Sequence, residues 1–293
     1  MAQQASKNSI KRTWKKSAGF VLAFVLFLGF CGMFFSLDLW LGFLNKQSVV
    51  TAVADSQYSA RAYEQMREDL EALMKDHSLE GETALALVDE DEFYTASGNM
   101  IKKTMKEKAQ DEPSQEDLIL EGSTSQFQWS LNDEITRQLT DKGIAITPEL
   151  KLAIEEIAFK AGSIYSQHID FQFGEQFTKA RETMVPMLQM MFFVSLGISF
   201  VAGMALILFY RRRHAALSYI NYALFGSVIA NLLVVGLLYV TNPMGETTAS
   251  LYYQNFIEQY ITQSLVPGLG LSAIGLIVAG VLWVAIRRIQ KEA

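Results

Sequence analysis

The stretch MFFVSLGISFVAGMALILFYRRRHAALSYINYALFGSVIANLLVVGLLYV, residues 191–240, decides the fold of this chain. Two long apolar runs are separated in it by three consecutive arginines and a histidine. A membrane-spanning helix needs about 20 predominantly apolar residues, and each run reaches that length. An arginine at the centre of a bilayer costs about 3 kcal/mol on insertion scales, so Arg211, Arg212 and Arg213 mark a membrane interface. The stretch therefore predicts a helical hairpin in the membrane.

Two further apolar runs lie outside this hairpin. The run 17–44 is interrupted only by Asp38, and the run 259–286 contains no charge. Because the chain is 50% hydrophobic and still 19% charged, it has room for four spans and for a sizeable polar portion. We therefore predict an all-α membrane protein. Its four transmembrane helices are expected at 18–44, 186–210, 217–240 and 265–286.

The first apolar run also has features of a secretory signal peptide. Basic residues precede it, and Ala52-Val53-Ala54 fits the small-x-small pattern of a cleavage site. The run is longer, however, than the roughly 7 to 15 residues typical of a signal core. We favour an uncleaved anchor, with cleavage as the alternative.

The distribution of charge predicts the orientation in the membrane. The segments 1–17, 211–216 and 287–293 together carry eleven lysines and arginines and one acid, Glu292. With four crossings these segments share one side, which the positive-inside rule makes the cytoplasm. Between the first two spans, residues 45–186 carry 14 Lys and Arg against 27 Asp and Glu. We therefore expect a plasma-membrane protein with both termini cytoplasmic and an extracytoplasmic helical domain at 45–185.

The arginine cluster 211–213 allows two roles. As a cytoplasmic turn it orients the hairpin, with Tyr210 and Tyr219 as interfacial anchors. Clustered cations also attract anionic lipid headgroups, at about 1 kcal/mol each. The topological role is favoured and a lipid headgroup site is the alternative. Membrane lipids are the expected partners, and no nucleic acid is expected.

Apolar residues recur at helical spacing through the domain 45–185. One stripe predicts a helix over about 53–75, a second begins at Phe93, and a third begins at Phe127 with Trp129 off the stripe. The acidic segment 109–126 contains proline and glycine and is expected to be a linker or exposed loop. Thr147-Pro148 has the residue types of a helix start. The domain is therefore expected to be helical.

The clearest periodicity in the chain follows this helix start. Apolar residues alternate four- and three-residue steps there, in a seam that resembles a short coiled coil and continues to His168. Such a seam must be buried. Packing inside the domain is the favoured explanation, and binding of a partner or of a second copy is the alternative. The seam consists of Leu150, Ile154, Ile157, Ala161 and Ile164.

The segment 241–264, between the third and fourth spans, also carries a helical stripe. The stripe contains three aromatic residues, Tyr253, Phe256 and Tyr260, and a single charge, Glu258, falls beside them. Such a helix can lie in the membrane interface or can cap the helical domain, and both alternatives stay open.

Small and polar residues in the spans predict close helix packing. Small residues let helix backbones approach, and serine or asparagine can hydrogen-bond across the contact. Transport pathways usually place ionisable residues inside the membrane, whereas Asp38 is expected near the outer end of its span. We therefore expect these residues to serve packing within one four-helix bundle, with contacts between the copies of a homo-oligomer as the alternative. The residues are Ser195, Ser199, Gly203, Ser227 and Asn231.

No set of residues specifies a reaction. Cys31 is the single cysteine, and the three histidines have no ligand-like spacing, so we predict no catalytic, cofactor or metal site. His168 with Asp170 is the nearest approach to an acid–base pair. The acidic run 89–92 is expected to be a solvated helix start.

The layout of one anchor, an outer helical domain and three closely spaced spans resembles uncharacterised membrane proteins of Gram-positive bacteria, which implies no activity. The span order also resembles permease subunits of the cell-division and macrolide-exporter ABC class. The favoured function is a non-enzymatic envelope protein whose outer domain binds a partner or ligand. A transporter component is the alternative and predicts a water-accessible cavity near Asn231 and Ser199. A membrane-anchored enzyme is the second alternative.

Overall fold

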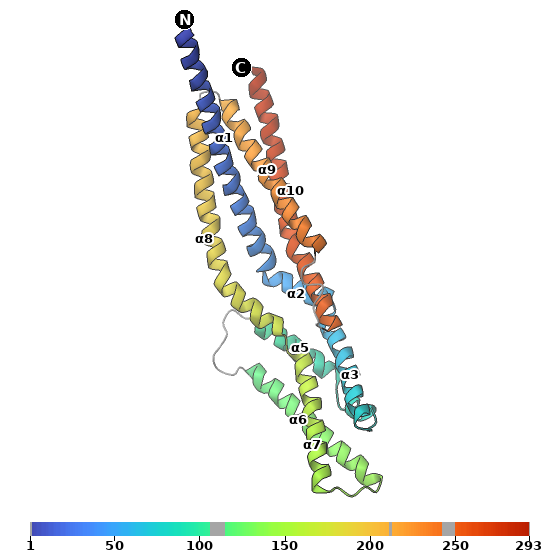
Figure 1. Cartoon of the computed structure of the whole chain (residues 1–293). Coiled ribbons are helices and arrows are strands. Elements are labelled where there is room, and N and C mark those ends of the chain that lie inside the picture. The colour runs from blue at the N-terminus through green and yellow to red at the C-terminus, as the bar shows by residue number, and fades with distance from the viewer. Residues whose placement is uncertain (1, 106–114, 211–212, 242–249, 293) are drawn as a thin grey trace. The chain divides into compact units, whose positions relative to one another are not determined.

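The computed structural model of the chain describes residues 2–105, 115–210, 213–241 and 250–292, and regular structure in these ranges is entirely helical (Figure 1). The chain divides into two compact units. The first, here called the bundle unit, comprises Met1–Ala52, Arg181–Thr247 and Ile257–Ala293. The second, here called the helical domain, comprises Val53–Ala180 and Thr248–Phe256.

Long apolar helices make up the bundle unit. They are α1 (Ala2–Asp38), followed by the π-helical turn η1 (Leu39–Phe43), with α8 (Gln172–Phe209), α9 (Arg213–Thr241) and α10 (Leu251–Glu292). Within the described residues, four helices are long and apolar enough to cross a membrane, which agrees with the predicted number of spans. The chain is therefore a multi-pass integral membrane protein.

The bundle helices are longer than the predicted spans. Helix α10 includes both the predicted amphipathic segment and the fourth span, and Pro267 lies inside it. Likewise, Pro186 lies inside α8. A proline removes one backbone donor, but membrane helices tolerate it because neighbouring groups satisfy the freed carbonyl. Neither proline therefore ends its helix.

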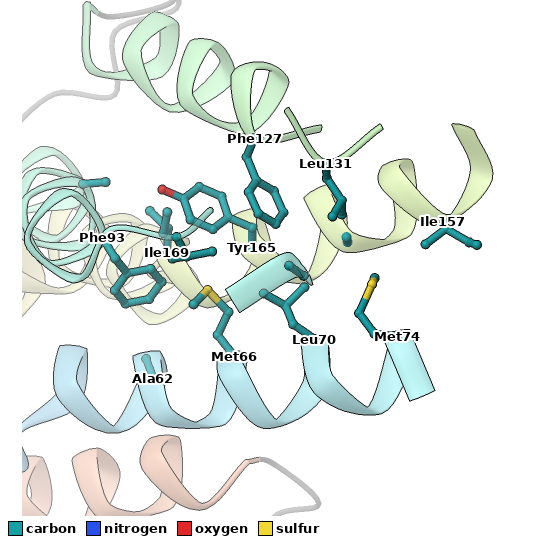
Figure 2. Close-up of a cluster of buried hydrophobic side chains, with 14 of the residues drawn as sticks. Ala62, Met66, Leu70, Met74, Phe93, Phe127, Leu131, Ile157, Tyr165 and Ile169 are labelled. Atoms are coloured by element: carbon teal, nitrogen blue, oxygen red, sulfur yellow. The ribbon is translucent and has the colours of Figure 1, made fainter. Parts of the chain in front are cut away.

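The helical domain is built from shorter amphipathic helices. They are α3 (Tyr58–Asp76), α4 (Glu82–Leu85), α5 (Glu90–Thr104), α6 (Gln115–Asp141) and α7 (Pro148–Ile169). Figure 2 shows Met66, Leu70 and Met74 pointing from one helix toward apolar side chains of the others. These three side chains are fully buried. The stripes that predicted the helices are thus the faces that form the core.

Two predicted helix starts are confirmed by side-chain caps. Asp89 Oδ1 accepts a hydrogen bond from the backbone nitrogen of Glu92 at 3.0 Å, so the acidic run is the first turn of α5. Thr147 Oγ1 accepts from the backbone nitrogen of Leu150 at 3.2 Å, and Pro148 occupies the first turn of α7.

Two predicted boundaries are wrong. The expected helix over 53–75 is broken, because α2 (Lys46–Asp55) ends before α3 and Gln57 takes the left-handed conformation with φ 53°. The expected linker 109–126 is helical from Gln115, since α6 begins there and continues through Gly122. Residues 106–114 of that linker lie outside the described residues.

The start of α10 belongs to the helical domain. Tyr58 packs edge-on against Tyr252 and Phe256, with ring centroids 5.2 and 5.6 Å apart, and Phe171 packs on the same cluster. Of the two alternatives for this segment, capping of the helical domain is the one observed for Leu251–Phe256.

Candidate functional site

A cavity of about 410 Å³ lies inside the bundle unit. Residues of α1, η1, α8, α9 and α10 line it, and its walls are mainly aromatic and aliphatic. Small-molecule sites typically have volumes of about 300–1,000 Å³ and mostly apolar walls with a few polar groups. The apolar wall includes Phe34, Phe35, Phe43, Val234, Val235 and Leu238.

Asp38, the last residue of α1, lines this cavity. Asn231 of α9 hydrogen-bonds to its carboxyl group and also donates from Nδ2 to Ser272 Oγ of α10, at 3.1 Å. The carboxyl oxygen Oδ1 of Asp38 is buried and has no hydrogen-bond partner among the described residues. A buried oxygen without a donor is costly, so this atom is the chemically unsatisfied point of the cavity.

Glycines bring the helices together around Asp38. A Cβ added at Gly268 would lie 3.1 Å from Asp38 Oδ2, and one added at Gly42 would overlap the carbonyl oxygen of Ser264. The hydroxyl of Tyr260 donates to the carbonyl oxygen of Phe43. This carbonyl is accessible to a side chain because η1 ends at Phe43 and the backbone nitrogen of Gln47, four residues on, hydrogen-bonds to Asn45 Oδ1 at 3.0 Å.

Sequence reasoning missed the functional potential of Asp38. It placed this acid near the end of a span, and it assigned the polar residues of the spans to packing, with a transport cavity near Asn231 and Ser199 as the alternative. The signal that was available is the single acid inside the apolar run 17–44. An ionisable residue within a transmembrane segment indicates a functional site by default.

The predicted packing residues fall into four situations. Ser195 and Ser199 of α8 are buried against Gly32 and Gly29 of α1, so small residues meet small residues. Ser227 is fully buried, and its hydroxyl donates to a carbonyl of its own helix. Asn231 bonds across helices, as described above. Gly203 has no close neighbour, since an added Cβ would meet nothing within 4 Å.

The structure describes only one arginine of the cluster 211–213. Arg211 and Arg212 lie outside the described residues, and Arg213 begins α9. The rings of Tyr210 and Tyr219 are 5.3 Å apart. The topological and lipid-binding roles of the cluster therefore stay predictions.

The seam of α7 lies in the core of the helical domain. Ile154, Ile157 and Ala161 are buried there, and Leu150 and Ile164 pack against the same cluster. Other residues of this chain therefore cover the seam. The opposite side of α7 exposes Leu152 and Phe159, with 66% and 68% of their surface accessible.

His168 contacts a different acid from the one that the sequence proposed. Its Nε2 lies 3.2 Å from Asp69 Oδ2 of α3, and its Nδ1 lies 2.8 Å from the carbonyl oxygen of Ile164. The ring is buried and also packs on Tyr252. These contacts join α7, α3 and the start of α10, which is a structural arrangement within the domain.

Asp170 stands apart from this pair. Burial, and to a lesser extent the nearby Glu175 carboxylate, raise the pKa of Asp170 above its usual range. Burial likewise raises the pKa of Tyr165 to about 12. Both shifts have burial as their main cause and involve no arrangement of a base with a nucleophile.

The described residues contain no group of three or more His, Cys, Asp or Glu that could hold a metal ion. Cys31 has a free thiol and lines the cavity. No protein-family model matches the chain, and no curated protein or solved structure shows significant similarity to it. Function is therefore inferred from the geometry of the cavity and of the helical domain.

Proposed function

We propose that this chain is a non-enzymatic membrane protein that binds a small molecule inside its helix bundle. The observation that carries this proposal is the cavity of about 410 Å³ with Asp38 in its wall. Packing alone does not account for it, because a helix bundle that serves only as an anchor gains from filling such a space with side chains. Sequence reasoning directed the binding function to the outer domain, and the cavity now directs it to the spans.

We further propose the predicted orientation, with both termini cytoplasmic and the helical domain outside the cell. The acidic composition of 45–186 and the basic composition of the short connecting segments support it. Protease treatment of intact cells should then cleave in the exposed part of this domain. Protection of the domain in intact cells, with cleavage only after lysis, would contradict this orientation.

The single native cysteine offers a direct test of the cavity. Cys31 lines it, so a small water-soluble methanethiosulfonate reagent should modify Cys31 in the protein held in nanodiscs. Replacing Ala230, another lining residue, with tryptophan should slow the modification because the larger side chain fills the space.

The matched control uses a lipid-facing position on the same helix. Leu28 lies one turn before Cys31, is 52% exposed and does not line the cavity. In the variant carrying Leu28→Cys and Cys31→Ser, the new thiol should react much more slowly, because the charged reagent does not enter lipid. A rate at Cys31 as slow as that at the lipid-facing position would show that the cavity admits no solute.

A second candidate function is protein association through the helical domain. It is favoured by the exposed Leu152 and Phe159, which lie seven residues apart and so on one side of α7. A photo-crosslinking residue at position 159 should capture a protein or a second copy in cells, whereas one at the exposed polar Asp76 of α3 should capture much less. Equal labelling at both positions would count against association through this face.

Transport is the alternative use of the same cavity. Asp38 favours it, because transport pathways place ionisable groups within spans. The cavity reaches Asn231, as a transporter predicts, but Ser199 does not line it. Reconstituted vesicles that accumulate a bound molecule would establish transport, and binding without accumulation would establish a receptor or carrier site.

A further inference from the structure

We propose that the bundle cavity recognises a lipophilic amine, whose ammonium group donates hydrogen bonds to Asp38 while its apolar body fills the remaining space. This inference rests on the binding function proposed above and specifies the chemical class of the ligand. It follows from the polar end of the cavity, its charge and its walls.

The polar end of the cavity, formed by Asp38 and Asn231, lacks one hydrogen-bond donor. Asn231 Nδ2 donates to Ser272 Oγ at 3.1 Å, and the same side chain hydrogen-bonds to the Asp38 carboxyl group. Asp38 Oδ1 is buried and has no partner among the described residues. A ligand that supplies a donor at this atom completes the network, and one that supplies only acceptors leaves it incomplete.

The charge of the cavity selects a cation over other donors. Among the described residues that line it, Asp38 is the one with a formal charge, and no lysine or arginine lines the wall. In a medium of low dielectric an opposite charge a few ångströms away is strongly favoured, and a second anion is strongly disfavoured. A hydrogen bond between charged partners is also roughly twice as strong as one between neutral groups.

The walls select an apolar or aromatic body for the ligand. Phe34, Phe35 and Phe43 lie on the α1 and η1 side, and Val235 and Leu238 lie on α9. Aromatic rings add to the attraction of a cation, and aliphatic groups take up hydrocarbon. Gly268 keeps space beside the carboxylate, because any Cβ there would press on Asp38 Oδ2 at 3.1 Å.

Three probes that share one body separate the contributions. Phenylbutylamine, phenylbutanol and phenylbutyrate carry the same aromatic chain with a cationic, a neutral and an anionic head. Binding is measured by equilibrium dialysis against the full-length protein in nanodiscs of neutral lipid, with empty nanodiscs subtracted. The amine should bind saturably and at least about tenfold more tightly than the alcohol, which corresponds to the greater strength of a charged hydrogen bond. The acid should bind least.

The variant Asp38→Asn keeps the size of the side chain and removes its charge. It should weaken the amine about tenfold and leave the alcohol within about threefold, so that the preference for the amine disappears. Asp76→Asn removes one charge from an exposed position in the helical domain and is the matched control, with unchanged selectivity. The comparison of the three probes on the unaltered protein does not depend on the folding of any variant.

The outcomes distinguish this inference from the proposed function. Equal binding of amine and alcohol, or an amine preference that persists in Asp38→Asn, would overturn recognition of a cation while leaving a working cavity. Absence of saturable amine binding, with Cys31 still open to its reagent, would likewise overturn the inference alone. A Cys31 that is no more reactive than the lipid-facing control would remove the proposed function itself.

Discussion

Replacing Gly29 with alanine should disrupt the contact between α1 and α8. An added Cβ at this position would overlap Ser199 Oγ and would lie 3.3 Å from the carbonyl oxygen of Ser195. The serine hydroxyl can rotate away, but the backbone carbonyl yields only if the helices separate. Because interiors are packed closely, the clash is relieved by a shift of one helix against the other.

The expected magnitude comes from two opposing effects. Adding a methyl group to a filled contact costs about 1–3 kcal/mol, whereas alanine in place of glycine within a helix returns up to about 1 kcal/mol. A control substitution at Gly197 of α8 separates the cost of the clash from the gain in helix propensity, because a Cβ added there would meet nothing within 4 Å. The Gly197→Ala variant carries the helix-propensity gain alone. We therefore expect Gly29→Ala to be less stable than Gly197→Ala by about 1–3 kcal/mol.

The assay is unfolding of the purified protein in mixed micelles by a denaturing detergent, followed by tryptophan fluorescence. The double variant Gly29→Ala with Ser199→Gly provides a partly compensating change, because it removes the nearer obstacle, the Ser199 side chain, and leaves the carbonyl oxygen of Ser195 in place. The coupling between the two sites should be about 0.5–3 kcal/mol in the favourable direction. The packing argument fails if Gly29→Ala and Gly197→Ala are equally stable, or if the two changes at positions 29 and 199 are simply additive.

Three further predictions concern the helical domain. Leu131→Ala empties part of a fully buried core and should lower the free energy of unfolding by about 2–5 kcal/mol, whereas the exposed Leu152→Ala should change it by less than about 0.5 kcal/mol. Thr147→Ala removes the cap of α7 and should cost about 1 kcal/mol in the same titration, and Thr147→Ser should restore it. Burial raises the pKa of Asp170 in the folded state above the pKa of about 3.9 that an aspartate has in the unfolded chain. Ionisation of this carboxyl group therefore opposes folding once the pH rises above about 3.9. Asp170→Asn should therefore raise the thermal midpoint at neutral pH but not in strong acid, and a difference independent of pH would contradict the assignment.

The number and type of the helices could be predicted from the sequence because both depend on local patterns. Charge-free runs of more than 20 residues specify spans, and three- and four-residue steps specify the buried faces of α3, α5, α6 and α7. The caps at Asp89 and Thr147 are equally local, since each involves a side chain and a backbone nitrogen three residues later.

The cavity could not be predicted, because its parts come from distant places in the sequence. Asp38 meets Asn231 and Gly268 only after the spans have chosen their neighbours and rotations. A pattern of small residues marks a helix as able to pack closely but does not state which partner it meets. Ser199 and Gly203 illustrate this limit, since both fit the pattern and only Ser199 is packed against another helix.

Helix ends were predicted poorly where two signals competed. Gly122 and the acidic residues around it indicated a loop, yet α6 continues through them toward the apolar stripe that begins at Phe127. A proline also disfavours the middle of a helix, yet α10 continues through Pro267. In both cases the local cost of one residue is about 1–3 kcal/mol, which packing of a long helix readily exceeds.

The π-helical turn at Leu39–Phe43 has a consequence for how such a site can arise. A turn of this kind holds one residue more than an α-helical turn, and one residue corresponds to a rotation of about 100°. The π-helical turn absorbs that extra residue, so deleting one residue between positions 39 and 43 would leave an ordinary α-helical turn and keep Asp38 on its present side of the helix. In genetic terms, the gain or loss of one codon at this turn leaves the carboxylate aimed into the bundle, whereas the same change in a regular α-helical turn would aim it elsewhere.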